Sequence, residues 1–239
     1  MQHKKSRITR REILGALTAA AGAAVVACGS SPTAASSISN GNSSTTTGGT
    51  TSGSCSVIPS ETEGPYPDRT GMINNPAFYR QDITEGRPGT PLTLALTVVS
   101  AANGCAPVAN ATIEVWQCDA AGAYSEYTVA GTFLRGLQRT DANGVATFNT
   151  IYPGWYTGRA PHIHLEVFVN GASVKTTQMA FPEDVSRAVY SQGVYASRGT
   201  NFTRNTTDNV FADGTTNEMA SMTGSTTSGY TAALQIGIA

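Results

Sequence analysis

The sequence predicts an all-β domain, organised as a β-sandwich with one or two short helices and long loops. Short runs rich in β-branched residues recur between turn residues, which is typical of sandwich strands. Residues 182–195 have the composition of a helix, with Glu183 and Asp184 near its start. No glycine-rich phosphate-binding motif interrupts the strands, so nucleotide binding has no support.

Residues 1–28 predict an export signal, because a basic region precedes the apolar run 13–27. Arg10 and Arg11 resemble a twin-arginine signal, and residues 25–28 resemble a lipobox in which Cys28 would be lipidated. The alternatives are an ordinary cleaved signal or a short membrane anchor, although a membrane span needs about 20 residues. We therefore expect a lipoprotein of the bacterial cell envelope, held to the membrane only by its N-terminal lipid.

The rest of the chain divides by composition into a tether and a domain. Residues 29–53 are almost entirely Ser, Thr, Gly, Ala and Asn, which predicts a flexible tether. Residues 54–239 are long enough for one domain with its own core. The signal holds five of the 15 basic and one of the 16 acidic residues, which leaves 10 and 15 and a net charge of −5. Such a balance argues against nucleic-acid binding.

Strand signals extend over most of the domain. The turn Asp141–Gly144 precedes an apolar run and predicts a hairpin. A second hairpin is expected about Asn170 and Gly171. The expected strands are 92–99, 111–116, 145–148, 162–169, 174–180 and 230–238.

Three cysteines remain after Cys28, namely Cys55, Cys105 and Cys118. Export into an oxidising compartment favours a disulfide between two of them, and all three pairings stay open. Cys118 follows an expected strand and could be buried near a site. No CxxC spacing is present, so a zinc site has little support.

The histidines of the expected strand 162–169 carry the strongest chemical signal. His162 and His164 are the only histidines outside the extreme N-terminus. Residues two apart in a strand project to the same face, so both rings would meet at one place. Tyr156 and Arg159 lie just upstream. The pattern predicts a metal site on a strand and its preceding loop, and the alternative is a polar pair on a solvated face.

Two further clusters are ambiguous when each is taken alone. Residues 116–124 end a strand and present Tyr124 from a small-residue turn, and such a tyrosine is commonly a packing residue. Residues 61–67 form a stiff extended segment that could be a plain loop.

Together the clusters resemble the intradiol ring-cleavage dioxygenases, the family of catechol and protocatechuate dioxygenases, from about residue 62 to 181. Several independent motifs occur in the family's order, which makes the resemblance specific. The matching motifs are Thr62–Tyr66, Trp116–Tyr124, Thr140 and Asp141 with Gly144 and Phe148, Thr150–Tyr156, Arg159–His164, and Thr177 with Gln178.

The resemblance implies one ferric iron per chain, with Tyr124, Tyr156, His162 and His164 as metal ligands. The chemistry suits that set, because phenolate oxygens are hard anionic donors and imidazoles complete the shell as neutral ligands. The competing geometry is a ferrous site with two histidines and one carboxylate. Glu166 has the same strand parity as the histidines and could supply that carboxylate.

The implied activity is cleavage of a catechol-type diol by dioxygen to a muconate-type diacid. Tyr156 would be the displaceable ligand, and Arg159 would stabilise developing negative charge, although it could instead be a surface ion pair. Gln178, Pro65 and Tyr66 would contact the substrate. Only five residues separate Tyr156 from His162, and this shorter loop should open the pocket to bulkier diols.

Two rivals to this function stay open. One is a non-catalytic exported β-sandwich that binds carbohydrate or another surface. The other is an iron- or catechol-binding envelope protein without turnover. Which diol is used and the oligomeric state are not assigned by the sequence.

Overall fold

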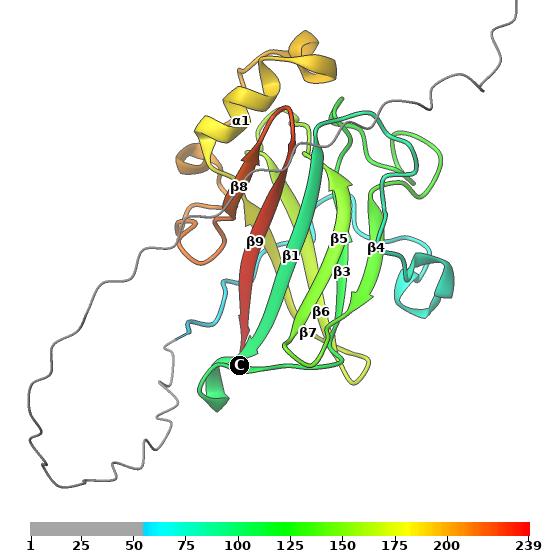
Figure 1. Ribbon diagram of the computed structural model, residues 1–239, viewed down its shortest axis with the longest axis vertical. Helices are drawn as coiled ribbons and strands as arrows, with labels where there is room; N and C mark the ends of the chain where they lie inside the picture. Colours follow the sequence, from blue (N-terminus) through cyan, green and yellow to red (C-terminus); the bar gives the residue numbers. More distant parts are fainter. Residues whose placement is uncertain (1–54) are drawn as a thin grey trace, which may run out of the picture. The chain divides into compact units, whose positions relative to one another are not determined.

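The computed structural model describes residues 55–239 of the 239-residue chain. The predicted export signal, the predicted lipobox cysteine and the whole of the predicted tether lie outside these residues. The described part consists mainly of two β-sheets that face each other (Figure 1). The predicted all-β sandwich is therefore confirmed.

The strands are named in chain order. They are β1 (Pro91–Ser100), β2 (Ala106–Pro107), β3 (Thr112–Trp116), β4 (Arg135–Arg139), β5 (Val145–Ile151), β6 (His162–Val169), β7 (Ala172–Ala180), β8 (Ser221–Ser225) and β9 (Gly229–Ile238). The first sheet has the order β2-β1-β9-β8, and β5 also pairs with β1. The second sheet has the order β4-β3-β6-β7.

The main core lies between the two sheets. In β1, alternate side chains such as Leu94 and Leu96 are fully buried, because residues two apart in a strand share a face. From the second sheet, Ile163, Leu165 and Val167 of β6 belong to the same apolar cluster. The inner face of β6 is therefore occupied by odd-numbered residues.

The outer face of the second sheet carries the polar residues of interest. His164 lies between two core residues of β6 and so projects from the opposite face. It is paired with Trp116 of β3 on one side and with Gln178 of β7 on the other. The sheet therefore sets these three residues in one row across its outer face.

The hairpin predicted about residues 141–144 was wrong. The turn itself is present, since the Gly144 amide donates to the Asp141 carbonyl at 3.0 Å. However, β4 pairs with β3 in the second sheet, whereas β5 pairs with β1 in the first. A turn signal indicates that the chain reverses, but the buried Ala146 and Phe148 draw β5 into the other sheet. The hairpin of β6 and β7 is confirmed.

The predicted helix is shorter than expected. Helix α1 spans Glu183–Tyr190, and a separate 3-10 helix follows at Gly193–Arg198. The helix is fixed to the chain that leads to the site: the Tyr190 hydroxyl donates to the Pro153 carbonyl at 2.9 Å. The hydroxyls of Tyr152 and Ser186 add a 2.7 Å hydrogen bond. Further 3-10 helices lie at Met72–Asn74, Pro76–Phe78, Ala101–Asn103 and Asn205–Thr207.

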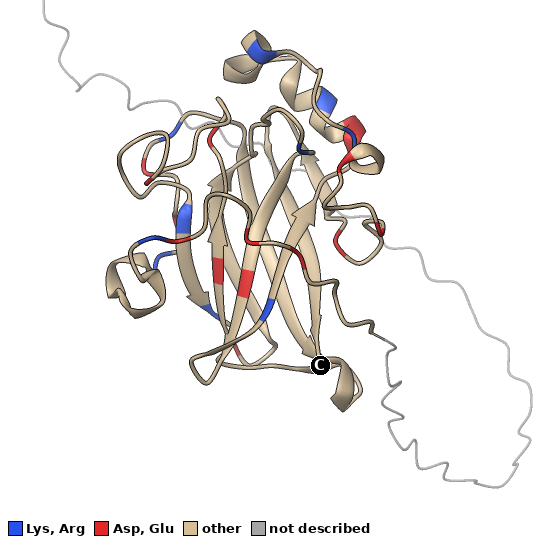
Figure 2. Ribbon diagram, turned by 180° about the vertical axis from the view of Figure 1, so that it is seen from behind, with Lys and Arg blue, Asp and Glu red and all other residues tan. Residues whose placement is uncertain are grey.

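One disulfide, between Cys55 and Cys105, resolves the pairing that the sequence left open. Cys118 is a buried free thiol, and burial raises its pKa to about 12, so it is an inert packing group. Charged residues are few and lie mostly in loops (Figure 2). Within residues 55–239, no helix is both long and apolar enough to cross a membrane.

Candidate active site

The two histidines of β6 meet on the outer face of the second sheet, as their spacing predicts. Their Nε2 atoms lie 3.1 Å apart, and both rings are buried. The indole of Trp116 lies flat against His164, with ring centroids 4.8 Å apart and an angle of 4° between the planes. This stacking fixes the orientation of the His164 ring and shields it from water.

A backbone contact decides which nitrogen of His162 is available. His162 Nδ1 lies 2.6 Å from the Ala160 carbonyl oxygen. Because a carbonyl can only accept, Nδ1 carries the proton and Nε2 keeps its lone pair. Burial, reinforced by the charge of Arg159, lowers the pKa of His162 to about 3 and that of His164 well below its usual value. Both imidazoles are therefore neutral and can each offer a nitrogen lone pair to a cation.

Two tyrosines complete the cluster. The Tyr156 hydroxyl lies 3.3 Å from His162 Nε2. The ring centroid of Tyr124 lies 6.0 Å from that of Tyr156 and 6.3 Å from that of His164. The Tyr124 hydroxyl is buried without a hydrogen-bond partner. Burial raises the pKa of Tyr156 to about 12 and raises that of Tyr124 well above its usual value, so both phenols are neutral unless a cation binds.

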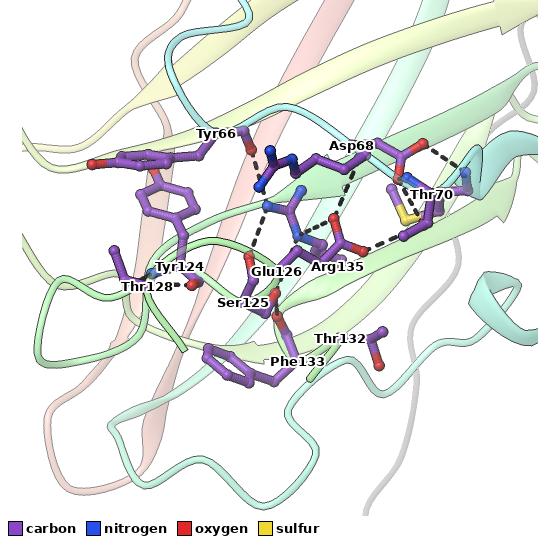
Figure 3. Close-up of polar contacts among 12 residues, drawn as sticks. Tyr66, Asp68, Thr70, Tyr124, Ser125, Glu126, Thr128, Thr132, Phe133 and Arg135 are labelled. Carbon is purple, nitrogen blue, oxygen red and sulfur yellow. Dashed lines mark hydrogen bonds and ion pairs between the residues drawn. The ribbon is translucent and has the colours of Figure 1, made fainter. Parts of the chain in front are cut away.

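The backbone about Tyr124 is fixed by neighbouring side chains (Figure 3). The Thr128 hydroxyl accepts from the Tyr124 amide and donates to the Tyr124 carbonyl. The buried guanidinium of Arg135 donates to the carbonyls of Ser125 and Tyr66 at 3.2 and 3.0 Å, and it forms an ion pair with Glu126 at 3.6 Å. Arg135 thus ties the loop of Tyr124 to the N-terminal segment.

The loop of Tyr156 is fixed by a close backbone approach at Gly154. A Cβ at this position would lie 2.3 Å from the Asp119 carbonyl oxygen, so no larger residue fits. The Gly154 amide donates to that same carbonyl at 3.1 Å, and the Cys118 thiol contacts the Gly154 carbonyl. The loops that carry the two tyrosines are therefore joined directly.

Arg159 is held by two groups at the edge of the cluster. Its Nε donates to both carboxylate oxygens of Asp208, at 3.1 and 3.0 Å, and a second nitrogen donates to Gln178 Oε1. Gln178 in turn donates to the Thr62 carbonyl at 2.8 Å. Asp208 is fully buried and also accepts from the Ala160 amide. The guanidinium is thus fixed beside the histidines rather than free on the surface.

Asp208 and Trp116 contact the cluster in ways that sequence reasoning missed. Asp208 follows a 3-10 helix and lies outside every motif that predicted the site. In the sequence Asp208 is simply an acidic residue in a loop with few charges, and that pattern is too common to indicate a role. Trp116 belongs to a quoted motif, but its stacking role depends on the β3–β6 register.

The N-terminal segment, residues 55–83, lies against the cluster through Gly64 and Tyr66. A Cβ at Gly64 would lie 3.0 Å from His164 Cε1, and its φ of +70° also favours glycine. Tyr66 stacks on Tyr124 with centroids 4.4 Å apart. Pro65, which lies between Gly64 and Tyr66 in the sequence, is exposed. This segment therefore borders the site on the solvent side.

Of the residues predicted for the site, Tyr124, Tyr156, His162, His164, Arg159, Gln178 and Tyr66 are brought together. Glu166, the alternative carboxylate ligand, is not among them. Its carboxylate accepts from the Ser173 hydroxyl, and among the described residues it does not group with the two histidines as a set that could share one metal ion. The geometry therefore offers two imidazole nitrogens and two phenol oxygens.

This donor set fits a metal ion. Two neutral nitrogen donors face each other, and a buried phenol lacks the hydrogen bond that such a group normally makes. A bound cation would satisfy all three and would lower the pKa of the phenols. Fold and site together define a β-sandwich protein with a histidine–tyrosine cluster suited to a single metal ion.

Comparison with known proteins identifies the family. A family model described as a dioxygenase matches residues 62–206. An intradiol ring-cleavage dioxygenase from Tetranychus urticae is 30% identical with a TM-score of 0.70, covering 77% of this chain and 95% of that one. The chain belongs to the intradiol ring-cleavage dioxygenases, as its motifs predicted.

Two further relatives agree. The dioxygenase domain of a dioxygenase–carbohydrate-binding fusion from Streptomyces sp. SirexAA-E is 30% identical with a TM-score of 0.56, covering 76% of this chain and 97% of that one. The protocatechuate 3,4-dioxygenase beta chain of Burkholderia cepacia is 35% identical over 122 residues, or 43% of this chain. The match spans about half, 52%, of that relative.

Proposed function

We propose that this protein is a non-haem ferric-iron dioxygenase that cleaves catechol-type diols with dioxygen to muconate-type diacids. The bond between the two hydroxyl-bearing carbons breaks, and both oxygen atoms of dioxygen enter the product. The observation that carries the proposal is the convergence of His162, His164, Tyr124 and Tyr156 at one buried point. Family membership supports the reaction type.

The proposed iron would be held by the two imidazole Nε2 atoms and the two phenol oxygens. Ferric iron bound there would supply a Lewis acid that can chelate both oxygens of a diol. Its positive charge favours phenolate ligands, which are hard anionic donors. The Ala160 carbonyl presents the lone pair of His162 by fixing its tautomer, and Trp116 orients His164.

The two tyrosines have different surroundings, which supports different roles. Tyr124 is fully buried, and its backbone is bracketed by Thr128. Tyr156 is half-buried in an irregular loop and lies next to the exposed Thr157 and Gly158. We assign Tyr156 as the displaceable ligand of the iron, and its phenolate would be the group that accepts a proton from a diol hydroxyl.

Arg159 would place a fixed positive charge beside the reacting ring. Preorganised charge stabilises negative charge that develops in a reaction, because it does not have to reorient. Asp208 and Gln178 provide this preorganisation by holding the guanidinium from two sides. Tyr66 offers an aromatic face above Tyr124, which suits stacking with an aromatic diol. Pro65 and Gln178 are the remaining proposed substrate contacts.

The proposed place of action is the bacterial cell envelope. The basic region, the apolar run and the lipobox-like Cys28 support export as a lipoprotein. A disulfide between Cys55 and Cys105 suits an oxidising compartment.

The purified mature protein should contain about one iron per chain and show a visible tyrosinate-to-iron charge-transfer band. It should consume oxygen with catechol or a larger diol and form a muconate-type product. Replacing Tyr124 by Phe or His164 by Ala should remove the band and weaken iron binding by about 100-fold or more.

Tyr127→Phe is the matched control, because Tyr127 touches Tyr66 but is not one of the proposed ligands. It should keep both iron and colour. A folded, iron-supplemented protein that stays colourless and iron-free would overturn the metal assignment. Colour without oxygen uptake across several diols would favour a binding protein.

A further inference from the structure

A second group of carboxylates lies close to the Asp208–Arg159 ion pair. Ligand oxygens of Glu61, Asp213 and Glu218 all lie within 4.8 Å of one another. Glu61 belongs to the N-terminal segment, and the other two belong to the loop between Asp208 and β8. Within residues 55–239, no lysine or arginine forms an ion pair with any of the three.

Glu218 is the member of this group that points to a ligand. Its side chain is fully buried, at 0% exposure. One carboxylate oxygen accepts from the Thr177 hydroxyl at 3.2 Å, whereas the other is buried without any partner. An unpartnered buried carboxylate oxygen is costly, and the same side chain has an oxygen within 4.8 Å of two further carboxylates. Burial, with Glu61 and Asp213 adding to the effect, raises the pKa of Glu218 to about 7.

The positive charge of the neighbouring Arg159 does not neutralise the three carboxylates. Arg159 lowers the pKa of Glu61, yet burial and the carboxylates of Asp213 and Asp208 act more strongly in total and leave that pKa raised. The guanidinium of Arg159 already binds both oxygens of Asp208. Three carboxylates therefore share one small volume without a cation of the chain to neutralise them.

We propose that Glu61, Asp213 and Glu218 bind a divalent cation of the calcium type. Calcium prefers carboxylate oxygens at 2.3–2.6 Å, so ligands on opposite sides of the ion lie about 4.6–5.2 Å apart. The oxygens of Glu61, Asp213 and Glu218 lie within 4.8 Å of one another, so one calcium ion could contact all three. The exposure of Asp213 leaves one side open to water, which calcium accepts as a further ligand.

The position of this cation site gives it a structural role. The backbone amide of Glu61 donates to the Thr176 carbonyl of β7. The next residue, Thr62, accepts at its carbonyl from the side chain of Gln178. The Glu218 carbonyl accepts from Ala180 at the end of β7. The ion would fasten the N-terminal segment and the 208–220 loop to the same strand. Both segments hold Arg159 in place through Gln178 and Asp208. The inference does not rest on the proposed function.

The test is calcium titration of the folded, iron-loaded mature protein, freed of calcium with a calcium-selective chelator. Calorimetry should show one calcium per chain, with a dissociation constant of about 1 mM or below. The Tm should rise with added calcium chloride. Asp213→Asn is the main variant because its side chain is exposed, and it should weaken binding at least about tenfold. Glu218→Gln should do the same.

Asp184→Asn is the matched control, an exposed aspartate at the start of α1. It should bind calcium like the unaltered protein. Absence of heat and of any Tm change up to about 10 mM calcium would overturn the proposal, because even weak extracellular calcium sites fill at that concentration. An unchanged response in Asp213→Asn would overturn it as well. Iron content and colour, read in parallel, distinguish this outcome from a failure of the proposed active site.

Discussion

At the scale of single residues, the site depends on groups that hold other groups. The Ala160 carbonyl fixes the tautomer of His162, and Asp208 fixes both the Ala160 amide and Arg159. Such partners are commonly as sensitive to substitution as the ligands themselves. Asp208 acts through its contacts rather than on a reacting atom, so it is a positioning residue.

Asp208→Asn should lower kcat by about 10- to 100-fold while the iron content and the charge-transfer band are kept. The amide keeps one acceptor but loses the charge that binds Arg159 from two oxygens. Steady-state kinetics and absorbance measured on one preparation provide the check. Loss of iron with unchanged rate per iron would show that Asp208 serves the backbone at Ala160 instead.

At this scale the sequence predicted which side chains meet in the cluster, because their spacing and motifs are local. His162 and His164 share a face by strand periodicity alone. The partners of Arg159 could not be predicted in the same way. The hydrogen bonds to Asp208 and Gln178 join residues 49 and 19 positions apart, and only the fold brings them together.

At the scale of elements, the N-terminal segment is the part that encloses the site. Gly64 places its backbone against the His164 ring, and Arg135 holds the Tyr66 carbonyl. The segment has little regular structure of its own, so it depends on these contacts for its position. Its motif residues therefore serve mainly to bring backbone close to the proposed ligands.

Gly64→Ala should destabilise the fold by about 1–2 kcal/mol from its left-handed backbone and should also displace His164. Gly71→Ala is a matched control, since its φ is +74° but no atom lies within 4 Å of the new Cβ. Urea unfolding should show a loss in both variants. Weakened iron binding should appear in Gly64→Ala alone; equal iron binding in the two would contradict the contact with His164.

Glu114 of strand β3 should make the stability of the fold depend on pH. Burial, reinforced by the charges of Asp68, Glu166 and Glu63 and opposed by that of Arg135, raises the pKa of Glu114 to about 8. The folded state therefore holds this proton more tightly than the unfolded state. Stability should fall as pH rises from about 4.5 to about 8, by a few kcal/mol, since one pKa unit corresponds to about 1.4 kcal/mol.

Glu114→Gln should remove this part of the pH dependence. The variant should match the unaltered protein near pH 4.5 and exceed its unfolding free energy above pH 8. Urea unfolding at both pH values measures the difference, and Asp184→Asn serves as an exposed control. A variant that is less stable than the unaltered protein at pH 8.5 would contradict the assignment.

At the scale of the whole molecule, sequence patterns predicted the sandwich and most of its strands. The strands that were missed, β2, β4 and β8, are short or poor in β-branched residues. The sheet to which a strand belongs was harder to predict, as the wrong hairpin at 141–144 shows. Sheet membership is decided by which apolar faces meet, and residues distant in sequence supply those faces.

The disulfide stabilises this whole arrangement by joining the N-terminal segment to the chain beyond β1. Closing a loop of 50 residues should contribute about 4 kcal/mol by the chain-entropy estimate. The double variant Cys55→Ser with Cys105→Ser should lose about that amount in urea unfolding. Reducing agent should lower the stability of the unaltered protein by a similar amount and leave the double variant unchanged.

Strand β9 lies inside the first sheet, between β1 and β8, and its pairing with β1 is parallel (Figure 1). Among the strands of residues 55–239 it is also the last in chain order. While the chain is being synthesised, β1 emerges early and has no partner on that side until residue 238 has followed. An open apolar strand edge readily pairs with other chains. A cell that makes this protein must therefore guard the open edge of β1 until β9 has been synthesised.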